Sequence, residues 1–252
     1  MFRLSPHFIE WSDAEVYAHT GYPETENVAT RDGKPPGPHT PVMLVAPIPN
    51  DNISRASLLQ ESTIISDFGQ SYVAACPPSS YKPGTMLSYQ PPEARFEGRA
   101  SFEADIWMLG CVIFEIRAGF SLFESFLGSD IEVLKHTVET LGRLPDPWWS
   151  AFEQRALWFE DDGKPKSEQD QDRAGVLLKA HRTSIKMKLL EIGKQDEPPF
   201  EDEGPMIEKS GIRRLFEDEV DLLVDLLQKM LKYCPEERIC IKDVIRHPWF
   251  TL

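Results

Sequence analysis

The sequence has no Gly-x-Gly tripeptide, the core of the glycine-rich loops that hold nucleotide phosphates. It also has no apolar run near the ~20 residues that a membrane-spanning helix needs, so we expect no membrane partner. Basic residues are scarce, with 27 Lys and Arg against 41 Asp and Glu, a formal charge of −14. A nucleic-acid-binding domain needs a basic face, so no nucleic-acid partner is expected. The acidity favours solubility or an attraction for basic peptides.

Cysteines are few and show no metal-site spacing, because Cys234 and Cys240, the closest pair, have no His partner. Cys111 sits in an apolar helical stretch, which is typical of a small core residue. Free thiols in a chain without a signal peptide predict a reducing, intracellular location, in the cytoplasm or the nucleus.

The most informative stretch of the sequence runs from Thr63 to Glu93. Its head, Thr63-Ile64-Ile65-Ser66, predicts a short β-branched strand, and Asp67-Phe68-Gly69 follows at once. Pro91-Pro92-Glu93 closes the stretch ahead of a strongly apolar helix. Other short motifs follow in order: Asp105-Ile106-Trp107-Met108-Leu109-Gly110, Pro235-Glu236-Glu237-Arg238-Ile239 and His247-Pro248-Trp249-Phe250.

In this order and at these distances, the motifs resemble a eukaryotic protein kinase from its activation segment to its last helix, over residues 63–252. Pro91 stands where the closing motif of that segment usually has Ala. The resemblance implies a mainly α fold, the C-terminal (large) lobe of a kinase domain. The small N-terminal lobe and the catalytic loop have no counterpart in the sequence.

Residues 1–62 resemble a remnant strand and a Pro-rich insertion of the same domain, as found in fungal relatives of the SR-protein kinases. By that resemblance, Phe2-Arg3-Leu4 is the strand that leaves the catalytic loop, and Pro35-Pro36-Gly37-Pro38 belongs to the insertion. The alternative is an ordinary N-terminal extension with a proline-rich linker.

Several helices are predicted downstream. Ser101 can cap a helix that runs to about Arg117, is stopped by Gly119 and is apolar nearly all round, hence buried. Helices are also predicted over 129–141, 220–231 and 241–246, and residues 173–190 keep a helix-like spacing. The charged stretch 160–219, with a loop expected over 196–203, is either a docking insertion or a solvated loop.

The resemblance assigns roles in the activation segment. Asp67 is the ligand of magnesium, and Asp67, Phe68 and Gly69 are the cofactor-binding residues. Without a small lobe above them, apolar residues around Phe68 should be exposed. Thr85 matches the threonine of the substrate loop, but three residues separate it from Tyr89, so Ser88 is the alternative.

Three further residues match positions that have structural roles in the family. Asp105 matches a buried aspartate that accepts hydrogen bonds from the catalytic loop; alternatively it only interacts with its own helix dipole. Glu93 and Arg238 match a buried ion pair, and the alternative is two unrelated surface charges. We therefore expect these two side chains to lie within hydrogen-bond reach and shielded from water.

The function implied is transfer of the ATP γ-phosphate to a Ser or Thr hydroxyl of a protein, with Mg²⁺. Arg/Ser-rich proteins are one substrate class that the resemblance suggests. The proton-accepting Asp, the phosphate-binding Lys and the glycine-rich loop have no match in residues 1–252, so no catalytic residue is assigned. We expect this chain to be inactive alone. The alternative function is a non-catalytic, pseudokinase-like scaffold or binding module.

Overall fold

The computed structural model describes residues 2–48, 58–74, 76, 78, 84–125, 128–194 and 213–252. The chain divides into two compact units, Met1–Gly69 and Gln70–Leu252. None of the helices in the described part is long and apolar enough to cross a membrane. The loop expected over 196–203 and the end of the 160–219 stretch before residue 213 lie outside the described residues.

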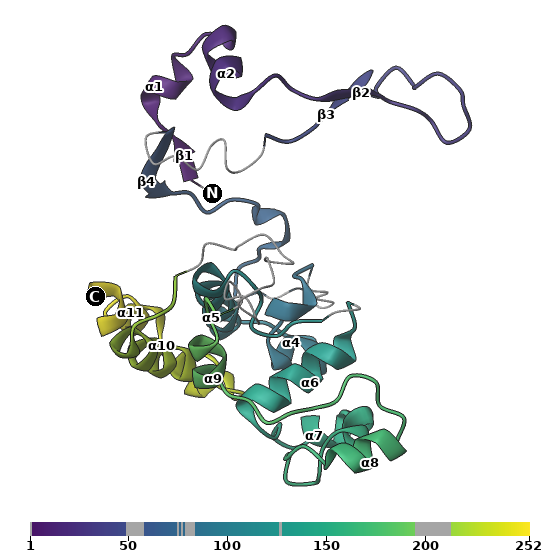
Figure 1. The fold of residues 1–252 in the computed structure, drawn as a ribbon, viewed down its shortest axis with the longest axis vertical. Coiled ribbons are helices and arrows are strands. Elements are labelled where there is room, and N and C mark those ends of the chain that lie inside the picture. The colour runs from purple at the N-terminus through teal and green to yellow at the C-terminus, as the bar shows by residue number, and fades with distance from the viewer. Residues whose placement is uncertain are drawn as a thin grey trace, which may run out of the picture. The chain divides into compact units, whose positions relative to one another are not determined.

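The first unit contains two small antiparallel sheets and two helices (Figure 1). Strand β1 (Phe2–Leu4) pairs with β4 (Leu59–Thr63), and β2 (Thr25–Asn27) pairs with β3 (Met43–Val45). The helices α1 (Pro6–Ile9) and α2 (Asp13–Thr20) follow β1 in the chain and precede β2.

Local sequence explains the start of α2. The Ser12 hydroxyl accepts the Glu15 N–H, and the Glu15 carboxylate accepts the Ser12 N–H at 2.8 Å, which forms a capping box. The strand predicted over 63–66 is wrong except for Thr63. Thr63 pairs with Phe2 at the start of β1 and is the last residue of β4, so Ile64 and Ile65 lie beyond the strand.

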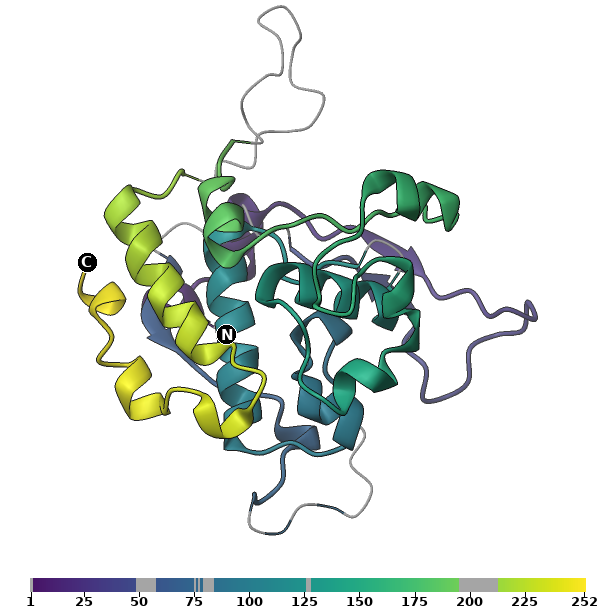
Figure 2. The ribbon, with the colours of Figure 1, turned by 90° about the horizontal axis from the view of Figure 1, so that it is seen from below.

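The second unit is mainly helical (Figures 1 and 2). Its helices are α4 (Pro92–Glu97), α5 (Phe102–Ala118), α6 (Asp130–Leu141), α7 (Trp148–Ala151), α8 (Glu168–Arg173), α9 (Ile185–Leu190), α10 (Glu217–Met230) and α11 (Ile241–Val244). Short 3-10 turns add Leu87–Tyr89, Glu153–Leu157, Pro235–Glu237 and Pro248–Thr251.

Helix α5 is the centre of the larger core, with α10 packed beside it (Figure 2). Trp107 and Phe114 of α5 and Leu227 of α10 are buried there. A Cβ at Gly110 would lie 3.2 Å from the Leu231 side chain, so glycine permits this close approach. A second core holds Trp149, Phe152 and other aromatic residues that follow α6.

Three details of the predicted helices are wrong. Ser101 stands at the N-cap of α5, but its hydroxyl donates to the Glu103 carboxylate and caps no backbone N–H. Helix α5 is not buried all round, because Ile116 is 75% exposed. Residues 173–190 are not one helix: α8 ends at Arg173 and α9 begins at Ile185.

Two interactions separate α8 from α9. Gly175 has a φ of 72°, a left-handed conformation that ends a right-handed helix. The buried Gln171 carboxamide then binds both backbone groups of Ala180, at 2.7 and 3.0 Å, in a segment that is not helical. A distant side chain therefore satisfies backbone groups that a helix would have paired.

Candidate functional site

Asp67-Phe68-Gly69 begins just beyond β4 in the first unit. Asp67 has a φ of 65°, and among the described residues it is the one non-glycine with a positive φ. Such a backbone costs free energy and is often retained where function requires it. Phe68 is 64% exposed, which confirms the expectation that apolar side chains around it are open to solvent.

Asp67 can hold a magnesium ion only together with other ligands. Its carboxylate is the hard oxygen ligand that Mg²⁺ prefers, and its side chain is exposed. Among the described residues no group of three or more acids, His or Cys could hold a metal ion. Mg²⁺ at kinase sites is bound by one or two carboxylates together with substrate phosphates and water, so Asp67 fits one position of such a set.

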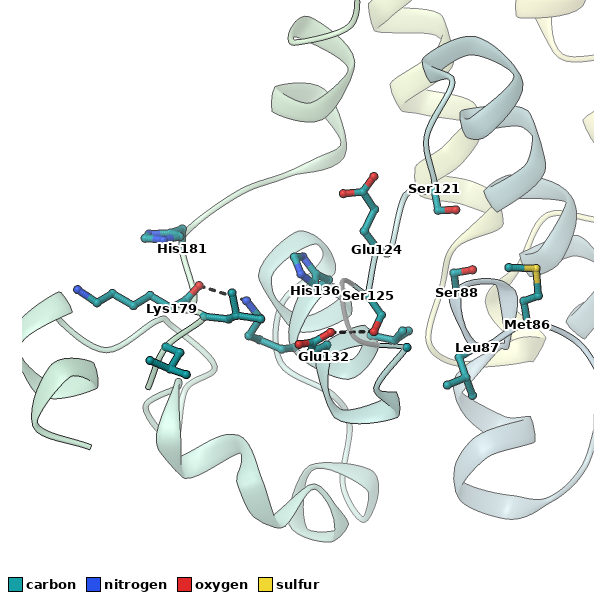
Figure 3. A pocket seen from close by; sticks show the side chains of 15 residues that line it. Met86, Leu87, Ser88, Ser121, Glu124, Ser125, Glu132, His136, Lys179 and His181 are labelled. Atoms are coloured by element: carbon teal, nitrogen blue, oxygen red, sulfur yellow. Dashed lines mark hydrogen bonds between the residues drawn. The ribbon is translucent and has the colours of Figure 1, made fainter. Parts of the chain in front are cut away.

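The predicted substrate loop lies in the second unit. The Thr85 hydroxyl donates to the Met108 sulfur at 3.8 Å, and the Thr85 carbonyl accepts the Gln90 amide at 3.1 Å. The Tyr89 hydroxyl donates to the Glu115 carboxylate, and burial together with that carboxylate raises the pKa of Tyr89. Both side chains are therefore tied to the protein, whereas Ser88 faces a cavity (Figure 3).

Arg95, which the sequence analysis did not select, fixes this loop to α6. Its guanidinium donates to the Leu87 carbonyl at 3.1 Å and lies 2.8 Å from the Asp130 carboxylate. Burial lowers its pKa, which the Asp130 charge partly offsets. A lone arginine carries no sequence signal for such a contact, because Leu87 and Asp130 meet it only in the folded chain.

Glu93 and Arg238 lie together, as the sequence predicts. Two parallel hydrogen bonds of 2.7 Å join the guanidinium to the carboxylate, and their side chains are 1% and 0% exposed. Arg238 also donates to the carbonyls of Lys232 at 2.8 Å and Glu103 at 2.8 Å, and stacks 5.1 Å over the Trp107 ring. The pair joins the start of α4 to the 3-10 turn ahead of α11.

Asp105 lies in the first turn of α5 and its side chain is exposed. Nearby protein atoms remove enough water from its carboxylate to raise its pKa. Within the described residues this carboxylate accepts no hydrogen bond. Asp105 shares one exposed stripe of α5 with Phe102, Val112 and Ile116, at the three- and four-residue spacing of a helix face.

A cavity of about 1060 Å³ in the second unit was not predicted. Its lining comes from three places in the sequence: residues 86–88, residues 121–125 with 128–136, and residues 177–181 (Figure 3). It contains the carboxylates Glu124 and Glu132 and the hydroxyls of Ser88, Ser121 and Ser125. Only folding brings these segments together, so no local pattern in the sequence indicates the site.

Comparison with protein families gives one match, which covers most of the chain. The sequence profile described as "Protein kinase domain" matches residues 56–250. This range contains Asp67, Glu93, Asp105 and Arg238.

Curated relatives match at low identity. The probable serine/threonine-protein kinase dyrk2 of Dictyostelium discoideum is 30% identical over 162 residues, which are 64% of this chain and 14% of that protein. The human dual specificity protein kinase CLK1 is 27% identical over 165 residues, 65% of this chain and 28% of that protein. The dual specificity protein kinase lkh1 of Schizosaccharomyces pombe is 28% identical over 164 residues, 65% of this chain and 20% of that protein.

Proposed function

This chain belongs to the protein kinase domain family, and from that premise we propose that residues 63–252 are the large lobe of a serine/threonine protein kinase domain. The buried Glu93–Arg238 pair is the observation that carries the proposal, because it joins two family motifs far apart in the sequence. We assign residues 1–62 to the strand and Pro-rich insertion that precede the activation segment. The antiparallel pairing of β1 with β4 supports this assignment.

The reaction of such a domain moves the γ-phosphoryl group of ATP to a protein hydroxyl. Asp67 would supply one ligand to Mg²⁺, whose charge offsets that of the phosphates when it is bound. The left-handed Asp67 turns the chain at this point, directly ahead of a 3-10 turn over Phe68–Gln70. Thr85 or Ser88 would contact the substrate near its hydroxyl.

Residues 1–252 alone are proposed to be inactive, because they contain no candidate for the proton-accepting Asp or the phosphate-binding Lys. The exposed stripe of α5 supports the need for a further segment. It presents Phe102, Val112 and Ile116 to water, with the partly desolvated Asp105 carboxylate among them. We propose that a catalytic segment from outside residues 1–252 covers this stripe and donates hydrogen bonds to Asp105.

The proposed substrates are proteins, with Arg/Ser-rich proteins as one class. The formal charge of −14 would attract basic segments at long range. We place the protein in the cytoplasm or nucleus, since its four cysteines are free thiols in the structure.

The second candidate function is a non-catalytic scaffold, favoured by the missing phosphate-binding residues together with the 1060 Å³ cavity. The protein isolated from the cells that produce it, incubated with labelled ATP, Mg²⁺ and an Arg/Ser-rich peptide, separates the two candidates. A kinase incorporates label, and Asp67→Ala abolishes the incorporation. A scaffold holds the peptide and transfers nothing.

A further inference from the structure

The β2–β3 ribbon of the first unit, formed by Thr25–Asn27 and Met43–Val45, is exposed to solvent (Figure 1). Its second strand and the residue ahead of it form an apolar run, Val42-Met43-Leu44-Val45, in which every side chain is 53–74% exposed. Within the part of the chain that the structure describes, no further strand pairs with either edge of the ribbon. A two-stranded ribbon is marginally stable in water, and an open apolar edge readily pairs with another chain. A third strand would therefore stabilise this ribbon.

The register of the ribbon shows which backbone groups of β3 remain for such a strand. The Val28 N–H donates to the Val42 carbonyl at 3.0 Å, so Val42 and Leu44 occupy the positions that bond β2. In an antiparallel pair these positions alternate with residues whose N–H and C=O point away from the partner strand. Met43 and Val45 lie at the alternate positions. Their backbone groups therefore face outward from the free edge of β3.

The free edge of β3 is complementary to the same edge of a second copy. When two copies run antiparallel with their Leu44 residues opposite one another, the outward N–H and C=O of Met43 in each copy meet those of Val45 in the other. This arrangement has a two-fold axis, as a closed dimer requires. Pro41 and Pro47 hold the next outward positions and have no N–H, so the ladder ends on both sides. The edge is thus symmetric and limited in length.

The charges of the two strands favour pairing through β3. Residues 40–48 carry no charged side chain. Two copies that paired through the outer edge of β2 would bring their Glu26 carboxylates directly opposite one another, and like charges at opposite positions are destabilising. After pairing through β3, Glu24 and Glu26 border the enlarged sheet and oppose the addition of another ribbon. Association should therefore stop at a dimer.

We propose that β3 is a dimerisation edge, at which two copies of this chain join their β2–β3 ribbons into one continuous antiparallel sheet. The two Leu44 side chains meet on one face of that sheet, and Met43 and Val45 of both copies pack together on the other. Burial of these apolar side chains supplies most of the affinity, because the new backbone hydrogen bonds replace bonds to water. The dimer does not depend on the proposed phosphoryl transfer.

Sedimentation of the full chain over a range of concentrations tests the proposal. The unaltered chain should show a monomer–dimer equilibrium. Leu44→Lys should raise the dissociation constant of the dimer at least about tenfold, because leucine burial is lost and two ammonium groups face one another across the axis. Leu252→Lys is the matched control, because Leu252 is also exposed, at 69% against 56% for Leu44, and lies outside the ribbon. It should leave the dissociation constant unchanged.

Cross-linking tests the register of the two copies. Opposite residues at a position without hydrogen bonds have Cα atoms about 4.5 Å apart, within reach of a disulfide. Leu44→Cys should therefore cross-link two copies under an added oxidant, whereas Met43→Cys, which lies opposite Val45, should cross-link much less. The unaltered chain measures the background from the exposed Cys76 and Cys240.

Three results would overturn the proposal. The first is a chain that stays monomeric at about 100 μM, where even weak interfaces assemble; this result would leave an extended segment of another protein as the occupant of the edge. The second is a dimer that Leu44→Lys leaves intact, since association would then use another surface. The third is equal cross-linking by Leu44→Cys and Met43→Cys.

Discussion

Removing one member of the Glu93–Arg238 pair should destabilise the second unit severely. Both side chains are shielded from water, so Glu93→Ala leaves a guanidinium buried without its carboxylate. Stranding one charge of a buried pair costs about 3–5 kcal/mol. The two hydrogen bonds of 2.7 Å support that size, since bonds to charged groups each contribute about 1.5–3 kcal/mol. Arg238→Ala should cost at least as much, because its bonds to the carbonyls of Lys232 and Glu103 are also lost.

The assay is urea unfolding followed by tryptophan fluorescence, with Trp107 stacked under Arg238 as a reporter. The Glu93→Ala/Arg238→Ala double variant leaves no buried charge, so it should cost about 0.5–3 kcal/mol less than the sum of the single variants. Asp221→Ala is the matched control, because its pair with Lys186 has the same 2.7 Å separation but is exposed. The control should change stability by less than about 1 kcal/mol. If Glu93→Ala unfolds like the control, the pair does not organise this unit.

Three further predictions concern single residues. Burial raises the pKa of the Cys111 thiol well above its ordinary value, so at pH 8 mass spectrometry should find alkylation at the exposed cysteines and none at Cys111 in the folded chain. Burial also raises the pKa of the Tyr233 phenol. In the unfolded chain this phenol loses its proton near pH 10, whereas in the folded chain it keeps the proton. The free energy of unfolding should therefore fall as the pH rises above about 10. Tyr233→Phe should reduce that alkaline loss, and an unchanged profile would refute the assignment. Gly163→Ala should destabilise the protein more than Gly175→Ala, by about 1–3 kcal/mol in thermal unfolding. Both glycines have a positive φ, but only a Cβ added at Gly163 would lie 2.9 Å from the Arg143 backbone. Equal effects of the two substitutions would contradict this.

The parts of the fold that could be predicted are those that depend on residues close together in the sequence, or on two residues that each lie in a recognisable motif. Helix α5 follows from its apolar run and from Gly119, whose φ of 77° ends it. The contact between Glu93 and Arg238 follows from the resemblance, since each lies in a recognisable motif.

The parts that could not be predicted depend on distant contacts. Gln171 binds both backbone groups of Ala180, so the helix-like spacing of residues 173–190 does not give one helix. Ile116 has the apolar character of a core residue, but its side chain is 75% exposed. The cavity is built from three separate segments, and no local pattern in the sequence indicates that they meet.

We propose that residues 1–252 form part of a kinase domain but contain no candidate for the groups that transfer phosphate. Incubation of the purified chain with labelled ATP, Mg²⁺ and Arg/Ser-rich peptides measures this directly, with the Asp67→Ala variant in parallel. We predict incorporation at background level for both proteins. Robust incorporation by the unaltered chain that Asp67→Ala abolishes would contradict the claim.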